Sequence, residues 1–483
     1  MTAHDELIRL TATEAVARLK CGDITPLELI DAAQWRISQV EPALNALPTL
    51  CLERGREHAR RLMRGEGSGV DEPGWLAGLP IAIKDLADVA GVRTTYGSPI
   101  FRDHVPSTSH PLVERIEKKG GIVIAKSNTP EFGAGGSTFN EVFGRTRNPW
   151  NTALTPGGST GGGAAAVAAG EVWLAHGSDH AGSLRRPATY CSAVGLRPSP
   201  GRVTRGTSNN LFAPLSVQGP MARNVADVAL FLDTMVGLCP RDPLTFDAPG
   251  LSFVSALAKP TAPKRVAYTA DFGGKVPVDR ETREICAAAV RRFEELGAVV
   301  EETSPDLGNI AEAFLALRSQ HYVVDRELML QMHRELLKPD IVWNTELGLK
   351  QSPSQIAAAE RERAALFRRC AQFFATWDLL VTPGASTPAF DVNLRMPTAI
   401  DGKVLEHYLG ASLITAATTM MGLPSIAVPC GFDQWGRPVG LQVVGRHRGE
   451  AALLQAAALF EGAMGLAQHL PIDPRPGTVP PST

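Results

Sequence analysis

The sequence lacks any long apolar run that is free of charge. Hydrophobic residues make up 44% of its 483 residues and charged residues 20%, and the two kinds are interleaved along the chain. Because a membrane-spanning helix needs about 20 consecutive apolar residues, we expect no membrane partner. The opening residues, MTAHDELIRL, also lack the basic and apolar segments of a secretory signal, so we expect a cytoplasmic location.

An excess of one charge and paired cysteines are missing as well. The chain has 48 Lys and Arg against 50 Asp and Glu, a formal net charge of -2, and its 7 cysteines form no C-x-x-C motif. Nucleic-acid binding favours a basic surplus, and disulfide frameworks and zinc sites favour regularly spaced cysteines. Residues 157–163 also lack the Lys-Ser/Thr that completes a phosphate-binding loop. We therefore expect reduced thiols, no nucleic-acid partner, no metal and no cofactor.

What the chain does contain is an alternation of helical and strand-like segments. Residues 111–119 predict a helix followed by a strand over 121–125, and residues 265–302 predict a unit of strand, helix and strand. Such units indicate an α/β fold with a large mixed, mainly parallel twisted β-sheet covered by α-helices. No repeat and no strong linker divides the chain, so we expect a single domain.

Five further segments bear on the candidate site. Apolar runs predict buried strands over residues 79–83 and 171–175, and the polar residues 176–182 predict a loop. Helical spacing predicts one helix over residues 219–237, with Pro at its start, and another over residues 404–421.

Glycine is concentrated between residues 155 and 188, around two serines that lie 24 positions apart (183 minus 159). An interior glycine costs a helix about 0.5–1 kcal/mol relative to alanine, so we interpret these glycines as sites of close backbone approach. Ser159 lies within Gly157-Gly158-Ser159-Thr160-Gly161. Ser183 ends the turn Asp179-His180-Ala181-Gly182-Ser183, whose successive N–H groups could point at one developing oxyanion.

Other interpretations of these residues stay open at this point. Ser159 could be the nucleophile of an α/β-hydrolase elbow, with His407 or His447 as its base, or simply a helix N-cap. Lys84 follows the apolar run 79–83. By itself this favours a lysine that extends its head group into water over a buried amine with a lowered pKa.

The combination of motifs resembles the amidase signature family, the Ser-cisSer-Lys amide hydrolases, and within it the stand-alone bacterial amidases. The resemblance runs from about residue 10 to 465 and is weakest between 240 and 400. Thr160 replaces the second serine of the family's serine pair, and Ala181 replaces a glycine. The matching segments are Gly78–Asp85, Lys126–Phe132, Gly157–Gly162, Asp179–Ala188, Gly195–Pro198, Gly422–Pro424, Pro429–Gly431 and Gly440–Gln442.

This resemblance implies a single amidase domain with the amidase signature fold. Its expected parts are an N-terminal helical segment (1–70), a signature core (75–240), a variable substrate-side region (241–400) and a C-terminal completion of the core (401–470).

The resemblance also implies roles for individual residues. Ser183 would be the nucleophile and Ser159, held by a cis peptide, would bridge it to Lys84, the base. A neutral lysine needs its pKa lowered from about 10.4 to roughly 7–8, which burial away from carboxylates would supply. We therefore expect Asp85 and Asp179 to be engaged by backbone hydrogen bonds. The backbone N–H groups of the oxyanion hole would come from His180, Ala181, Gly182 and Ser183, with Asp179, Arg185, Thr160 and Gly158 in support.

The sequence indicates a class of substrate and no individual compound. The resemblance implies a small aryl, alkyl or ω-amino-acid amide as partner, and a homodimer is an assembly that the sequence permits. We expect substrate contacts from residues 300–400, with Gly133, Phe212 and Trp343 as candidates beside Asn209, Asn210 and Leu211. We expect Arg185 to hold its loop and His180 to face solvent in a structural role.

Three alternatives remain. One is a carbamate or ester hydrolase that uses the same triad, and another is a glutaminase-type subunit of a tRNA-dependent amidotransferase. The latter is disfavoured because the chain has no basic run to face tRNA. The third is a catalytically silent binding protein of the same fold, which intact Lys84, Ser159 and Ser183 disfavour.

Overall fold

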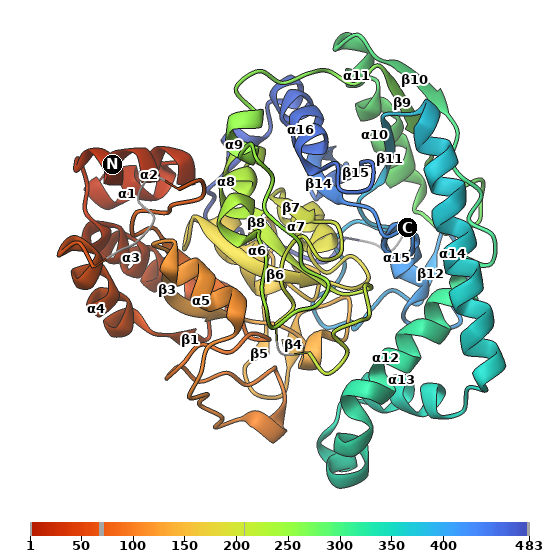
Figure 1. Ribbon diagram of the computed structural model, residues 1–483, viewed down its shortest axis with the longest axis horizontal. Coiled ribbons are helices and arrows are strands. Elements are labelled where there is room, and N and C mark those ends of the chain that lie inside the picture. Colours follow the sequence, from red (N-terminus) through yellow and green to blue (C-terminus); the bar gives the residue numbers. More distant parts are fainter. Residues whose placement is uncertain (1, 67–71, 207, 481–483) are drawn as a thin grey trace.

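A computed structural model describes residues 2–66, 72–206 and 208–480. Residues 67–71, where the expected N-terminal segment (1–70) ends, lie outside the described residues. Four helices open the chain and pack together beside the first edge of the sheet (Figure 1). These helices are α1 (Ala3–Arg9), α2 (Ala12–Cys21), α3 (Pro26–Leu44) and α4 (Leu52–Met63).

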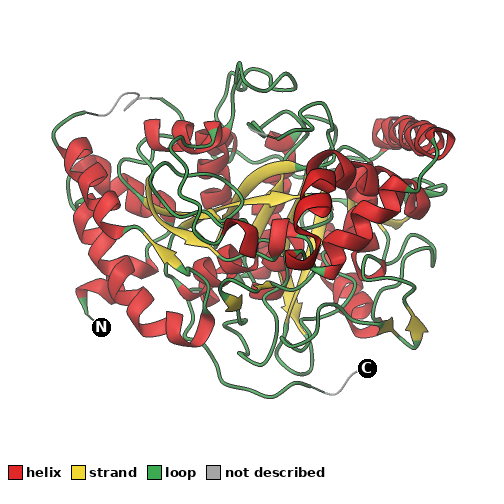
Figure 2. Cartoon of the chain, turned by 90° about the horizontal axis from the view of Figure 1, so that it is seen from below, coloured by secondary structure: helices red, strands yellow, loops and turns green. Residues whose placement is uncertain are grey.

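An eleven-stranded mixed sheet forms the central layer, with helices on both of its faces (Figure 2). In spatial order its strands are β1 (Thr49–Leu50), β3 (Ile122–Ser127), β2 (Pro80–Lys84), β6 (Leu174–Asp179), β8 (Val217–Ala222), β7 (Val194–Arg197), β14 (Ser425–Phe432), β15 (Pro438–Val444), β11 (Leu379–Pro383), β9 (Arg265–Tyr268) and β10 (Val299–Glu302). Two short hairpins lie outside this sheet, β4 (Phe139–Asn140) with β5 (Gly144–Arg145) and β12 (Ala399–Ile400) with β13 (Lys403–Val404).

The predicted α/β class, a mixed sheet covered by helices, is confirmed. Parallel pairs join β3, β2 and β6 toward one end of the sheet and β11, β9 and β10 at the other. The strands between these groups, and the short edge strand β1, pair antiparallel. One parallel group thus contains β3, from the predicted helix and strand over residues 111–125, and the other contains β9 and β10, from the predicted strand–helix–strand unit over residues 265–302.

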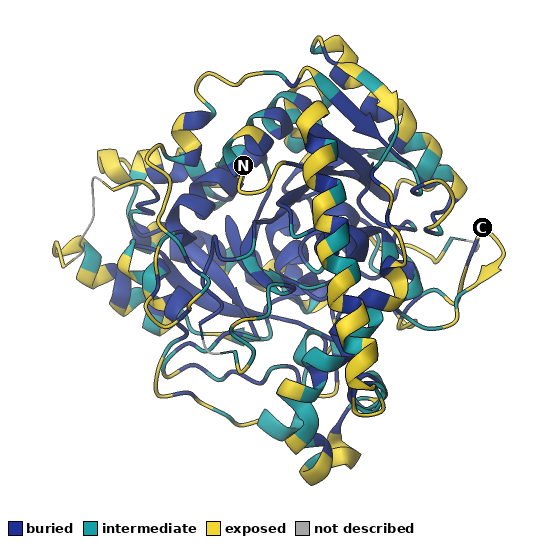
Figure 3. Ribbon diagram, turned by 45° about the vertical axis from the view of Figure 1, so that its right-hand side comes forward, coloured by how far each residue is buried: buried dark blue, intermediate teal, exposed yellow. Residues whose placement is uncertain are grey.

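The remaining helices cover the sheet or build its substrate side. They are α5 (Pro111–Lys118), α6 (Gly161–Ala169), α7 (Arg185–Cys191), α8 (Val225–Met235), α9 (Phe253–Ala256), α10 (Arg280–Val290), α11 (Arg292–Glu295), α12 (Ile310–His333), α13 (Pro339–Leu349), α14 (Pro353–Thr376), α15 (Leu413–Met420) and α16 (Glu450–Met464). Helices α12 to α14 stand beside the sheet, and α14 exposes one long face (Figure 3). None of the helices in the described residues is long and apolar enough to cross a bilayer.

Three sequence predictions need correction. The helix expected over residues 219–237 is strand β8 followed by α8, because Asn224, and not Pro220, caps the helix by accepting the Asp227 N–H. The helix expected over 404–421 starts only at Leu413, after Gly410, a poor helix former. The loop expected over 176–182 is largely strand, because β6 continues to Asp179 through its pairing with β8.

Helix α6 explains the glycine-rich stretch. All of its residues are buried, and a Cβ added at Gly162 would lie 2.4 Å from the backbone nitrogen of Asn128. The helix therefore presses directly on the chain that leaves β3, which only glycine permits. This close approach brings Ser159, at its N-terminal end, against the ends of the central strands.

Candidate active site

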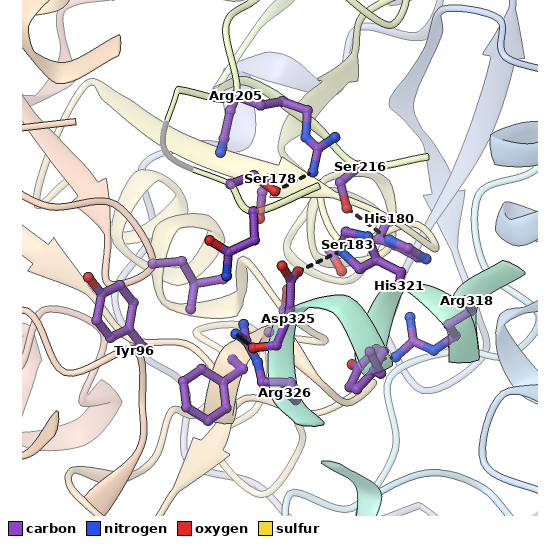
Figure 4. A pocket seen from close by; sticks show the side chains of 18 of the residues that line it. Tyr96, Ser178, His180, Ser183, Arg205, Ser216, Arg318, His321, Asp325 and Arg326 are labelled. Atoms are coloured by element: carbon purple, nitrogen blue, oxygen red, sulfur yellow. Dashed lines mark hydrogen bonds and ion pairs between the residues drawn. The ribbon is translucent and has the colours of Figure 1, made fainter. Parts of the chain in front are cut away.

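The three predicted catalytic residues come from three neighbouring chain segments. Lys84 is the last residue of β2, Ser159 lies just before α6, and Ser183 lies just before α7. Both serines line one cavity of about 350 Å³, a volume within the usual range for small-molecule sites. Figure 4 shows Ser183 among the polar side chains of this cavity.

Lys84 is fully buried, and its ammonium nitrogen is surrounded by hydroxyl groups. Its Nζ lies 2.7 Å from Ser159 Oγ, 3.0 Å from Thr160 Oγ1 and 3.1 Å from Ser178 Oγ. Burial lowers the pKa of Lys84 to about 7, with Asp179 opposing the shift. Of the two interpretations that the sequence left open, the buried amine holds and the lysine extended into water is wrong.

The loop around Ser159 is packed from both sides. The Gly158–Ser159 peptide is cis. A Cβ on Gly158 would lie 2.8 Å from the carbonyl oxygen of Gly135, and a Cβ on Gly133 would lie 3.3 Å from Ser159 Oγ. The Thr160 N–H donates to the carbonyl oxygen of Ser183 at 3.1 Å, so the two serine loops are joined directly.

Asp179 organises the turn that leads to Ser183. Its carboxylate accepts the backbone N–H groups of Gly182 at 3.0 Å and Leu184 at 3.1 Å, as expected for a carboxylate engaged within the turn. It also pairs with Arg185 at 2.8 Å and Arg197 at 3.3 Å. These two guanidinium groups and the N–H donors hold the pKa of Asp179 well below its usual range despite burial.

This arrangement changes the expected set of oxyanion donors. The Gly182 N–H is committed to Asp179. Within the described residues, the backbone N–H groups of His180, Ala181 and Ser183 donate to no protein acceptor. These three of the four expected donors are therefore free to bind an oxyanion.

Arg185 holds the turn and is fully buried, in agreement with its expected role. Beyond Asp179, its guanidinium donates to the carbonyl oxygen of Thr415 at 3.0 Å and to Thr419 Oγ1 at 2.9 Å. It also reaches Thr418 and Gln442. Helix α15 and strand β15 are thus joined to the turn.

The carboxylate of Asp85 forms its hydrogen bonds and its ion pair with residues other than Lys84. Its Oδ2 accepts the backbone N–H of Thr95 at 3.1 Å and its hydroxyl at 2.6 Å. Its Oδ1 forms an ion pair with Lys126 Nζ at 3.2 Å. The carboxylate next to Lys84 in the sequence is therefore paired with a different lysine.

The structure separates the predicted substrate-binding candidates. Gly133 and Asn209 line the cavity. Phe212 is 76% exposed and Trp343 packs against Tyr408, and neither is among the lining residues. The expectation of a solvent-facing His180 is wrong. Its ring lines the cavity, with Nδ1 2.8 Å from Ser216 Oγ and Nε2 buried without a partner among the described residues.

The bases proposed for an α/β-hydrolase are also elsewhere. His407 packs against Trp343 and His447 against Phe367, whereas the Ser159 hydroxyl contacts Lys84.

Sequence reasoning missed two parts of the site. Ser178 was assigned to a loop, although its place on a continued strand beside β2 would have brought it to Lys84. Helix α12 forms part of the cavity wall, but the sequence predicted this only as substrate contacts from residues 300–400 and named no residue of the helix. Its lining residues recur at helical spacing, which would have identified one polar helix face. They are Arg318, His321, Tyr322, Asp325, Arg326 and Met329.

Comparisons with known proteins agree with this geometry. An acylamidase of Rhodococcus erythropolis is 34% identical over 470 residues, which cover 96% of this chain and 97% of that protein. A glutamyl-tRNA(Gln) amidotransferase subunit of Synechococcus sp. (strain CC9605) is also 34% identical, with 92% and 94% covered. The crystal structure of a bacterial aryl acylamidase of the amidase signature family superposes with a TM-score of 0.87 at 30% identity, covering 95% of this chain and 97% of that one. The amidase family model matches residues 28–454, and the chain therefore belongs to the amidase family and is an amidase, a hydrolase of carbon–nitrogen bonds in amides.

Proposed function

We propose that the chain hydrolyses a small aryl, alkyl or ω-amino-acid amide through an acyl-enzyme on Ser183. The observation that carries this proposal is the position of Lys84. Its buried amine, with a pKa of about 7, contacts the Ser159 hydroxyl at 2.7 Å, and within the described part of the chain its hydrogen-bond partners are all hydroxyl groups. A lysine of this kind can be neutral near pH 7 and act as a general base.

The proposed acylation step moves two protons in sequence. Neutral Lys84 accepts the Ser159 proton as Ser159 accepts that of Ser183, and Ser183 Oγ forms a bond to the amide carbonyl carbon. The His180, Ala181 and Ser183 N–H groups bind the resulting oxyanion. Ser159 then donates its proton to the amide nitrogen and regains one from Lys84, the C–N bond breaks and the amine leaves. Water deacylates Ser183 by the same relay and releases the carboxylic acid.

Supporting roles in the proposal follow from the contacts of each residue. Thr160 keeps the hydroxyl of the serine that it replaces and directs it at Lys84. Gly158 admits the tight loop, Asp179 and Arg185 hold the turn, and Gly182 shapes the oxyanion region from beside it. Gly133 borders the reacting atoms.

The test uses the purified chain with 4-nitroacetanilide, which releases 4-nitroaniline. We expect hydrolysis by the wild type, and Ser183→Ala and Ser159→Ala should each reduce kcat at least ~10³-fold, as expected for removal of a member of a covalent relay. Ser38→Ala, an exposed serine on α3, is the matched control and should retain full activity. Retention of activity by Ser183→Ala would rule out the assignment.

Two alternative substrates require their own tests. Carbamates and esters are chemically accessible to the same nucleophile and should be compared with amides of equal acyl group. The similarity to amidotransferase subunits makes free glutamine the second alternative. Release of ammonia from glutamine by the chain alone, at a rate exceeding that for anilides, would favour that assignment.

A further inference from the structure

Three arginines line the catalytic cavity without an ion-pair partner. Arg205, Arg318 and Arg326 all border it, and Figure 4 shows them around Ser183. Among the ion pairs of the described residues, none joins a carboxylate to any of the three. Arg205 and Arg318 are buried and Arg326 is partly buried. Removing a cation from water without a counter-charge is unfavourable, so their position suggests that a ligand supplies the missing anion.

The three guanidinium groups differ in how far the protein already uses them. Arg318 donates to Asn344 at 3.1 Å and to two tyrosine hydroxyls. Arg205 donates to two backbone carbonyls and, at 2.9 Å, to Ser208. Among the residues that the structure describes, Arg326 donates only to the carbonyl oxygen of Asp325, at 2.8 Å. It therefore has the most donors left for a ligand.

Arg326 is also placed close to the proposed reaction centre. Its guanidinium lies over the Phe132 ring, 4.2 Å from the ring centroid. The next residue, Gly133, approaches the Ser159 hydroxyl so closely that a Cβ there would lie 3.3 Å from Ser159 Oγ. An amide bond at the serines would thus bring its substituents to this arginine.

The other charged and titratable groups of the cavity leave its balance positive. Asp325 is the one carboxylate among the lining residues, and its Oδ2 is already paired with His321 Nε2 at 3.1 Å. Burial lowers the pKa of His321 to about 3 and that of His180 well below its usual value, so both rings are neutral. Three guanidinium groups therefore face one carboxylate.

We propose that the physiological amide carries a carboxylate, and that Arg326 is the residue that selects it. The planar fork of a guanidinium binds both oxygens of a carboxylate, and stacking on Phe132 fixes its plane. This inference rests on the proposed function, because it assigns the substrate class of the same site.

The test compares pairs of substrates that differ only in this charge. On the acyl side, glutaryl 4-nitroanilide is matched with 5-oxohexanoyl 4-nitroanilide, in which a methyl ketone replaces the carboxylate. On the amine side, 4-acetamidobenzoate is matched with 4-acetamidoacetophenone. We expect kcat/KM to favour the carboxylate at least tenfold in one pair, and that pair identifies the side of the substrate that Arg326 contacts.

Variants assign the preference to Arg326. In Arg326→Gln the ratio should fall to about one, and Arg326→Lys, which keeps the charge but loses the fork, should give an intermediate ratio. Arg361→Gln, at an exposed arginine on α14, is the control and should keep the wild-type ratio. A wild-type ratio near one in both pairs, or an unchanged ratio in Arg326→Gln, would overturn the inference.

A binding measurement separates this inference from the catalytic proposal. Calorimetry on Ser183→Ala should show glutaryl 4-nitroanilide or 4-acetamidobenzoate binding at least tenfold more tightly than its ketone partner, and the difference should vanish in Ser183→Ala/Arg326→Gln. If the wild type hydrolyses none of the four compounds but this binding difference is present, the catalytic proposal fails and the arginine assignment stands. Equal binding of both members in each pair refutes the assignment.

Discussion

Lys84 and Lys126 occupy adjacent strands of one sheet, and the charges of their immediate surroundings differ. Both are fully buried, and Lys126 on β3 lies opposite Ile83, the neighbour of Lys84, on β2. Lys126 has a carboxylate, that of Asp85, at 3.2 Å, whereas the partners of Lys84 are three hydroxyls. Burial lowers the pKa of both lysines, and only for Lys126 does an adjoining carboxylate oppose it directly.

The difference teaches that burial alone does not make a lysine into a base. Successive side chains along an extended chain point to opposite faces, so Asp85, which follows Lys84 directly, turns toward Lys126 instead. Lys126 is held in an ion pair with Asp85, whereas Lys84 contacts hydroxyl groups and stays available for proton transfer. Four predictions test this contrast, in order of decreasing effect.

The largest effect is expected from Lys84→Met. Loss of a general base lowers kcat by about 10²–10⁴-fold, while the melting temperature should stay the same or rise because a buried amine is replaced by an apolar group. Anilide hydrolysis and thermal unfolding measure the two quantities. Substantial destabilisation together with residual activity near wild type would contradict the assignment.

Lys126→Met should show the reverse pattern. Removal of one partner of a buried ion pair leaves Asp85 unpaired and costs about 3–5 kcal/mol of unfolding free energy, measurable by urea denaturation. Activity per folded molecule should fall far less than in Lys84→Met. The double variant Lys126→Met/Asp85→Asn should recover part of the stability, and failure to recover any would mean that the ion pair is not the cause.

The pH profile gives the third test. The base must be neutral, and the pKa of Lys84 is about 7, so kcat/KM should rise with pH through 7 and fall roughly tenfold per unit below it. Asp85→Asn should leave this acid limb in place, because Asp85 is paired with Lys126 and not with Lys84. A shift of the acid limb by more than one pH unit in Asp85→Asn would mean that Asp85 acts on Lys84 as well as on Lys126.

The smallest effect is expected from Ser178→Ala. Its hydroxyl accepts a hydrogen bond from Lys84 Nζ at 3.1 Å and so favours the charged form. Its removal should lower the apparent pKa of the acid limb by a few tenths of a unit, which raises relative activity at pH 6 about twofold. Thr160→Ser, which retains a hydroxyl at Lys84, is the control and should leave the limb unchanged.

The sequence predicted the parts of the site that depend on local chain geometry. Glycine spacing drew attention to Ser159 and Ser183 within the chain itself. The strand that ends in Lys84 by itself favoured a lysine extended into water, and the expected roles of all three residues came from the resemblance to the amidase signature family. The continuation of β6 was missed because His176 and Ser178 are polar, and only pairing partners such as Gln218, whose Oε1 lies 2.9 Å from His176 Nε2, make such residues acceptable in a buried strand.

The cavity wall depends on contacts between distant segments. Arg326 reaches Phe132 across 194 positions of sequence (326 minus 132), and nothing near either residue indicates this contact. Phe212 was chosen for its aromatic ring, yet the loop that carries it turns the ring outward. The assignment of residues 1–70, 75–240, 241–400 and 401–470 to separate roles stays a prediction.

The bonds between Arg185 and helix α15 have a consequence for biosynthesis. The turn that carries Ser183 depends on Thr415, whose hydroxyl donates to the Ala181 carbonyl oxygen at 2.7 Å, and on Gln442, from strand β15 of the sheet. A ribosome makes Ser183 long before it makes these partners, and contacts across such separations form late. The proposed nucleophile is therefore expected to stay unsupported in the nascent chain, so that hydrolytic activity arises only once translation has delivered the C-terminal strands.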